Sequence, residues 1–183
     1  MTTDKSTALD ILDFWWRAGP AKWFASDAGF DAEIETRFGT LVARALDGDF
    51  AEWETSPHGA LALLLLLDQF PRNLFRGTAR AFAGDGRALR LAQASLDAGF
   101  DRAFPREART FFYLPFEHAE DMDAQQTSVD LFRRLGNQET YFYALVHLDV
   151  IRRFGRFPHR NAALGRETTA EERAYLEDGG FSA

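Results

Sequence analysis

Residues 60–67, Ala-Leu-Ala-Leu-Leu-Leu-Leu-Leu, form the longest apolar run of the chain. Ser56 precedes this run as a typical N-cap residue, and Pro57 suits the first position of a helix. A helix that is apolar on nearly every side belongs at the centre of a bundle. We expect this helix to end at residues 68–70, because Pro71 lacks the amide hydrogen that would continue it.

Helical signals cover almost the whole chain, with glycine and proline between the segments and no sustained alternation of the kind that strands show. Asp31 is the expected N-cap of one helix, Thr169 and Glu172 form an expected capping box, and the chain is expected to fray at Gly179-Gly180. The expected helices span residues 7–17, 31–47, 56–70, 85–98, 105–118, 123–135, 138–154 and 169–177. The sequence therefore predicts an all-α fold, with one domain over residues 1–183 and no sheet.

Composition narrows the class of protein. With 183 residues, 46% of them hydrophobic, the chain can bury a core without disulfides. It contains no cysteine, which excludes thiolate metal sites and thiol catalysis and favours a cytoplasmic location. The apolar run is far shorter than the ~20 residues that span a bilayer. A net charge of −7 argues against a nucleic-acid or membrane-surface partner. No cofactor is predicted, because neither standard glycine-rich phosphate loop is present.

One short pattern occurs twice, each time after a long helical stretch. Phe70-Pro71-Arg72-Asn73 is followed by Arg76, and Phe157-Pro158-His159-Arg160-Asn161 is followed by Arg166. The helices before the two copies also resemble one another. We therefore predict a diverged repeat of antiparallel helical hairpins over residues 31–77 and 123–166.

The two loops carry guanidinium and amide donors that suit a carboxylate or a phosphate, provided that the loops lie at the same end of the stack. The candidate ligand-binding residues are Asp68, Gln69, Arg72, Asn73, Arg76, Arg153, Arg156, His159, Arg160, Asn161 and Arg166. An alternative is that these side chains cap the preceding helices or lock the hairpins together. A buried Asp68 needs a cation, and an arginine of the second loop is its expected partner.

Three histidines and one aspartate could act in general acid–base chemistry near neutral pH. The candidate catalytic residues are His118, Asp121, His147 and His159. His147 lies on an apolar helical face, so a structural histidine of the core is the alternative there. Asp121 could instead cap the helix that follows it. No spacing of these residues matches a metal signature, and no metal site is predicted.

Three strings of residues resemble one known family. They are Asp68-Gln69-Phe70-Pro71-Arg72-Asn73 with Arg76, Leu114-Pro115-Phe116 with His118, Glu120 and Asp121, and residues 153–161 with Gly165-Arg166. Together they resemble the bacterial family catalogued as domain of unknown function 924, from Ile11 to about Leu176. The resemblance implies a tetratricopeptide-like stack of helices and no established activity. Ala119 departs from the family pattern, in which a serine is expected.

Three functional interpretations stay open. In the first, the two loops bind a small anionic molecule such as a phosphorylated or carboxylated metabolite. In the second, a tetratricopeptide-like stack binds the peptide of a partner protein through the same arginines. In the third, a cluster of histidine, aspartate and arginine side chains makes the protein a hydrolase. The sequence does not determine the oligomeric state.

Overall fold

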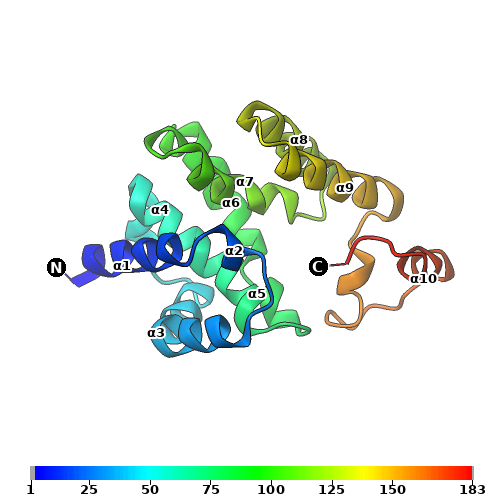
Figure 1. Cartoon of the computed structure of the whole chain (residues 1–183), viewed down its shortest axis with the longest axis horizontal. Helices are drawn as coiled ribbons and strands as arrows, with labels where there is room; N and C mark the ends of the chain where they lie inside the picture. The colour runs from blue at the N-terminus through cyan, green and yellow to red at the C-terminus, as the bar shows by residue number, and fades with distance from the viewer. Residues whose placement is uncertain (1–2, 183) are drawn as a thin grey trace. The chain divides into compact units, whose positions relative to one another are not determined.

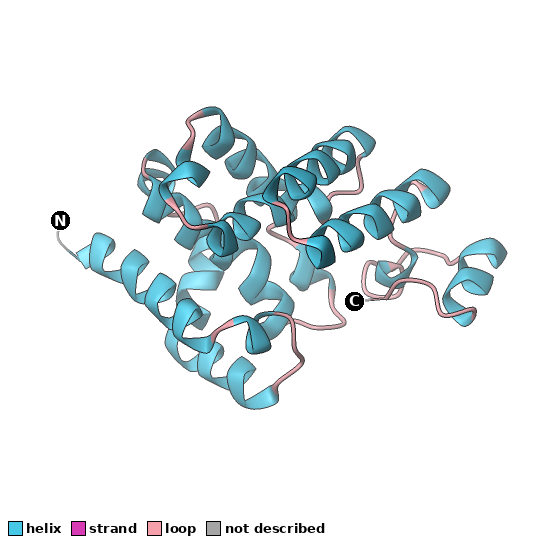
Figure 2. Ribbon diagram, turned by 45° about the horizontal axis from the view of Figure 1, so that its top comes forward, coloured by secondary structure: helices cyan, strands magenta, loops and turns pink. Residues whose placement is uncertain are grey.

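The computed structural model describes residues 3–182, with side chains from Thr7 onward. These residues form helices and turns without any strand, which confirms the expected all-α fold (Figure 1, Figure 2). The chain divides into two compact units. Unit 1 comprises Met1–Arg76 and Arg80–Phe112, and unit 2 comprises Gly77–Ala79 and Tyr113–Ala183. The arrangement as a single domain stays a prediction.

Unit 1 is built around the apolar segment. Its α-helices are α1 (Thr3–Ala18), α2 (Pro20–Trp23), α3 (Ala28–Leu46), α4 (Pro57–Leu64), α5 (Phe70–Leu74) and α6 (Asp85–Asp97). Shorter 3₁₀ turns are η1 (Ala51–Thr55), η3 (Ala79–Phe82) and η4 (Phe100–Ala103), and α7 (Arg106–Glu117) runs from unit 1 into unit 2. Residues 59–71 are all buried, and α1, α6 and η1 pack against α4. The segment is therefore the central helix of its unit, as its composition predicts.

The central helix does not stop before Pro71, and this expectation was wrong. A π-helical turn, η2 (Leu65–Gln69), follows α4, and the amide of Phe70 bonds to the carbonyl of Leu65. Pro71 then lies in the first turn of α5. A π turn is wider than an α turn, so the chain stays helical at this point although proline donates no hydrogen bond.

Gly84 leaves no space for a side chain in this region. A Cβ at Gly84 would overlap the carbonyl oxygen of Leu67 in the π-helical turn. We expect Gly84→Ala to lower the free energy of unfolding by about 1–3 kcal/mol, because backbone atoms on both sides must shift. The matched control is Gly86→Ala inside α6, where the nearest atom to the new Cβ is the Arg90 side chain at 3.7 Å. Thermal melts in which Gly84→Ala is as stable as Gly86→Ala would contradict the prediction.

The third helix begins one turn earlier than expected. Asp27, and not Asp31, is its N-cap, and its Oδ1 accepts hydrogen bonds from the amides of Gly29 at 2.9 Å and Phe30 at 3.0 Å. Asp31 therefore lies within the first turn of α3. Its carboxylate points away from the helix axis like other side chains and can bond to residues outside α3.

Aromatic side chains add to the core of unit 1. Trp15 is fully buried, with its ring centroid 5.5 Å from that of Phe111 and 6.1 Å from that of Trp23. Phe14 stacks on Phe30 at 5.3 Å. These rings contribute to the core of the unit, as expected from their spacing.

Unit 2 contains α8 (Met122–Leu135), α9 (Gln138–Phe154), the 3₁₀ turn η5 (Pro158–Arg160) and α10 (Ala170–Glu177). The helices α8 and α9 lie side by side as a hairpin (Figure 1). Thr169 and Glu172 form the expected capping box of α10. The apolar core of this unit contains Val150, Ile151 and Phe157, against which Met122, Phe154, Tyr175 and Phe181 pack. Among the described helices, none is both long and apolar enough to span a membrane.

Candidate functional site

The donor side chains of the first loop bond to carboxylates of the same unit. Arg72 forms a two-pronged ion pair with Asp85, with N–O distances of 2.8 and 3.0 Å. Its Nη1 also lies 3.2 Å from Oδ1 of Asp68, a side chain whose residue is only 1% exposed. The side-chain amide of Gln69 donates to the other oxygen of Asp68. Arg72, four residues further on, is thus a cation beside buried Asp68. The expected pair between Asp68 and an arginine of the second loop stays a prediction.

The same loop is tied to the start of its hairpin. Asn73 donates to Oδ1 of Asp31 at 2.7 Å, and Nη2 of Arg76 lies 3.2 Å from both Asp31 oxygens. Asp31 can accept these bonds because α3 begins at Ala28 and does not need Asp31 as a cap. The loop after α5 is therefore connected to the first turn of α3 by two side chains.

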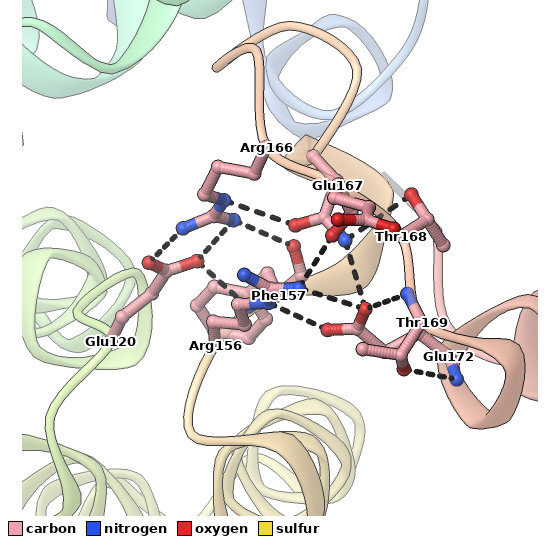
Figure 3. Close-up of polar contacts among 9 residues, drawn as sticks. Glu120, Arg156, Phe157, Arg166, Glu167, Thr168, Thr169 and Glu172 are labelled. Atoms are coloured by element: carbon pink, nitrogen blue, oxygen red, sulfur yellow. Dashed lines mark hydrogen bonds and ion pairs between the residues drawn. The ribbon is translucent and has the colours of Figure 1, made fainter.

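The second loop makes a corresponding connection in unit 2 (Figure 3). Arg166 pairs with both oxygens of Glu120, at 2.6 and 2.9 Å, and donates to the carbonyl of Phe157 at 3.1 Å. The amide of Phe157 donates to Glu120 at 2.7 Å. Burial alone would raise the pKa of Glu120, but the hydrogen bonds from Arg166 and Phe157 hold this pKa below its usual value. Glu120 directly precedes Asp121, the N-cap of α8, so this loop also returns to the start of its hairpin.

Arg156 and Asn161 hold α10. Both oxygens of Glu172 accept from Arg156, at 2.6 and 2.9 Å, and Arg156 also donates to the carbonyl of Glu167 at 2.7 Å (Figure 3). Asn161 and the amide of Thr169 bond to Glu172 at 3.2 and 2.8 Å. Glu172 is 2% exposed, and its pKa is lowered to about 2, chiefly by the hydrogen bond from Arg156.

Eight of the predicted ligand-binding residues therefore have partners within their own unit: Asp68, Gln69, Arg72, Asn73, Arg76, Arg156, Asn161 and Arg166. Arg153 is exposed and lies over the rings of Phe154 and Tyr175, at 4.9 and 4.7 Å. Such contacts are the ones expected from the alternative interpretation, in which these side chains have a structural role and hold the helical hairpins together. Ligand binding by these residues stays a prediction.

Three of the predicted residues meet in unit 2 around His147. The His147 ring centroid is 6.3 Å from that of His118, 5.5 Å from that of Phe157 and 4.3 Å from that of Phe181. The ring of His159 lies 5.3 Å from Phe181. We call His118, His147, His159 and Arg160 the histidine–arginine cluster.

Arg160 is the buried cation of this cluster. Its residue is 6% exposed, and its guanidinium lies 4.4 Å from the centre of the Phe157 ring. His118 and His159 are partly exposed, so the cluster extends from the buried His147 ring toward solvent. Asp121, the fourth candidate catalytic residue, is exposed and caps α8 by accepting from the amide of Ala124 at 2.9 Å.

His147 is oriented by two oxygens. Its Nδ1 lies 2.8 Å from the carbonyl of Tyr143 and 3.5 Å from Oε1 of Glu117, which is 4% exposed. A carbonyl oxygen only accepts, so Nδ1 carries the hydrogen and Nε2 has the free electron pair. Burial and, as the second cause, the neighbouring His118 together lower the pKa of His147 to about 3. His147 is therefore a neutral imidazole at neutral pH.

Sequence reasoning missed Glu117 and Gln125, which position the cluster. The side-chain amide of Gln125 donates to the carbonyls of Glu117 at 2.6 Å and Ala119 at 2.8 Å, on both sides of His118. Gln125 is completely buried, and its Oε1 has no hydrogen-bond partner among the described residues. Neither residue belongs to a motif, so only the packing of α8 against the end of α7 could identify them. Among the side chains that the structure describes, from Thr7 to Ser182, no group of His, Asp or Glu is arranged to hold a metal ion.

Unit 1 has a surface pocket of about 410 Å³ at which none of the predicted site residues lies. Its lining residues are Asp13, Phe14, Arg17, Ala18, Lys22, Phe30, Glu33 and Arg37. The charges at its rim are largely paired with one another, since Arg17 lies 3.0 Å from Asp13 and Arg37 lies 3.4 Å from Glu33. Most charged side chains at this pocket are therefore already paired with one another, and we do not take it as the candidate site.

Comparison with known proteins places the chain in a family. The family model described as bacterial protein of unknown function (DUF924) matches residues 11–180. The chain belongs to this family. The solved structure of the protein of unknown function ATU0120 from Agrobacterium tumefaciens is 49% identical to this chain in sequence. It superposes with a TM-score of 0.92 over 96% of this chain and 99% of that one. No curated protein matches the chain. Membership in the DUF924 family confirms the resemblance seen in the loop strings.

Proposed function

We propose that unit 2 binds a small anionic molecule at the histidine–arginine cluster. The observation that carries the proposal is the convergence of three imidazoles with Arg160 around the buried ring of His147. The guanidinium of Arg160 and the N–H groups of His118 and His159 are donors that suit a carboxylate or a phosphate, and such hydrogen bonds strengthen where water is excluded. His147 contributes an acceptor, Nε2, because its Nδ1 faces Tyr143. The proposed anion site thus lies at the histidine–arginine cluster of unit 2 and uses no residue of the first loop.

A second candidate is proton transfer to or from the bound molecule. It is favoured by the orientation of His147, whose Nδ1 faces Tyr143 and Glu117 and leaves Nε2 as an acceptor. An imidazole oriented in this way by a carboxylate has the geometry of a general base, but a pKa of about 3 makes His147 a weak base near neutral pH. A hydrolase acting on a small ester or anhydride would use His147 as the base and Arg160 to stabilise negative charge. The peptide-binding interpretation stays a prediction.

The test is isothermal titration of the purified chain with inorganic phosphate and with acetate. We expect phosphate to bind the wild type and Arg160→Gln to weaken this binding by about tenfold or more, which corresponds to ~1.4 kcal/mol. Arg153→Gln is the matched control, because Arg153 is an exposed arginine seven positions earlier in the same segment. Its affinity for phosphate should equal that of the wild type.

Arg160→Gln alters a buried residue, so its far-UV circular dichroism must match that of the wild type before affinities are compared. His159→Gln, at a partly exposed position, provides a second variant with a smaller risk to the fold. No binding of either anion at millimolar concentration, or equal affinity of wild type and both variants, would contradict the proposal.

A further inference from the structure

The segment after α10 places an aromatic ring in the histidine–arginine cluster. Phe181 lies with its ring centroid 4.3 Å from that of His147, 5.3 Å from His159 and 6.5 Å from Phe157. The ring of Phe181 is tilted against His147 at 54° and lies edge-on to the other two rings, at 81° and 61°. Pairs of aromatic rings prefer such tilted and edge-on arrangements.

Two glycines direct the chain to this position, where fraying was expected. Gly179 has φ +80°, a conformation that few other residues adopt. Gly180 has no space for a Cβ, which would overlap the carbonyl and ring of Tyr175. The amides of Gly180 and Phe181 then donate to the carbonyl and hydroxyl of Tyr175, at 2.9 and 2.8 Å. The turn therefore carries Phe181 from the end of α10 back to His147.

The surroundings of Phe181 fit an aromatic ring that carries an anion. Two imidazoles and one phenyl ring surround the position of the side chain, and the guanidinium of Arg160 lies over Phe157 in the same group of rings. The two amide hydrogen bonds of this segment described above both end on Tyr175. A ligand ring could replace the Phe181 ring without unfolding α10.

We infer that the position of the Phe181 ring is the subsite for an aromatic ring of the ligand, so that the anion bound by unit 2 is an aromatic carboxylate or phosphate ester. This inference rests on the proposed anion site. Phe181 is then an internal competitor, which covers His147 while the site is empty of ligand and moves away when a ligand ring enters. An internal competitor weakens binding, because the apparent affinity equals the intrinsic affinity multiplied by the fraction of molecules in which the competitor has left the site.

The experiment compares phenyl phosphate with methyl phosphate, which carries the same anion without the ring. Both are titrated into the wild type and into Phe181→Ala. We expect Phe181→Ala to bind phenyl phosphate about tenfold more tightly than the wild type, whereas the affinity for methyl phosphate changes by less than about twofold. The affinity of Phe181→Leu for phenyl phosphate should lie between those of the wild type and Phe181→Ala, because leucine keeps an apolar side chain at this position.

Phe154→Ala is the matched control, since Phe154 is a partly buried ring of the same unit that packs on Tyr175 at 5.1 Å. It should leave the ratio of the two affinities unchanged. A ratio in Phe181→Ala equal to that of the wild type overturns the inference, and it leaves the anion site in place if both esters still depend on Arg160. Absence of binding by either ester overturns both. Tight binding of phenyl phosphate that survives Arg160→Gln would support the ring subsite and contradict the anion site.

Discussion

Arg72→Ala is expected to lower the free energy of unfolding by about 3–5 kcal/mol, the cost of removing one partner from a buried ion pair. The substitution leaves the carboxylate of Asp68, which is 1% exposed, without the guanidinium that lies 3.2 Å away. It also removes the two-pronged pair with Asp85. Buried carboxylates are costly when their cation is lost, and Asp68 lies in the central helix where little else can move.

Tryptophan fluorescence during urea denaturation measures this effect, because all four tryptophans, Trp15, Trp16, Trp23 and Trp53, lie in unit 1. The matched control is Arg76→Ala in the same loop. The side chain of Arg76 is 44% exposed in its pair with Asp31, so this variant should lose no more than about 1 kcal/mol. Equal losses for the two arginines would show that burial of Asp68 does not set the cost.

Glu172→Gln is expected to destabilise unit 2 by about 1.5–3 kcal/mol, which is the range for hydrogen bonds to a charged group. The substitution keeps the shape of the side chain but removes the charge that faces Arg156. It also turns one acceptor oxygen into a donor beside Asn161 and the amide of Thr169. Because Glu172 connects α10 to the loop, the loss should appear first as opening of α10.

The pH dependence of this contribution has a definite sign. The pKa of Glu172 falls from 4.5 to about 2 on folding, so folding favours the ionised form. Its stabilising contribution is complete above pH 4.5 and is lost as the pH falls toward 2. The stability difference between the wild type and Glu172→Gln should therefore shrink over that interval.

Hydrogen exchange of peptides covering residues 156–177 measures this opening without contributions from unit 1. Glu171→Gln is the control, since Glu171 is the exposed neighbour in the first turn of α10. Protection of α10 in Glu172→Gln equal to that in Glu171→Gln would contradict the prediction. A difference that stays constant between pH 5 and pH 2 would contradict the role of the charge.

Helix starts could be predicted from sequence wherever the cap was local. Ser56 with Pro57, and Thr169 with Glu172, determine their helices within four residues, and the structure has them as predicted. The start of α3 could not be assigned correctly, because Asp27 and Asp31 are equally suitable caps by type. Only the hydrogen bonds of Asp27 to Gly29 and Phe30 decide between them.

The partners of the loop arginines could not be predicted, because they lie outside the segment in which the pattern is visible. Residues 152–166 contain five arginines and no acid, which indicates a basic surface. In the structure, Arg156 pairs with Glu172 and Arg166 pairs with Glu120. These acids lie 16 and 46 residues from their arginines. The meeting of His147 with Phe181 depends on the turn at Gly179-Gly180, whose direction no local signal indicates.

The π-helical turn at Leu65–Gln69 takes up one residue within the central helix. Such a turn contains one residue more than an α-helical turn would need. Because the wider turn absorbs this residue, Arg72 and Asn73 keep their direction toward Asp85 and Asp31. Removing a residue from the regular α-helical part, Pro57–Leu64, would instead rotate everything that follows by about 100° around the helix axis. The π-helical turn is therefore the place in the central helix where loss of one residue would least disturb the loop that carries Arg72.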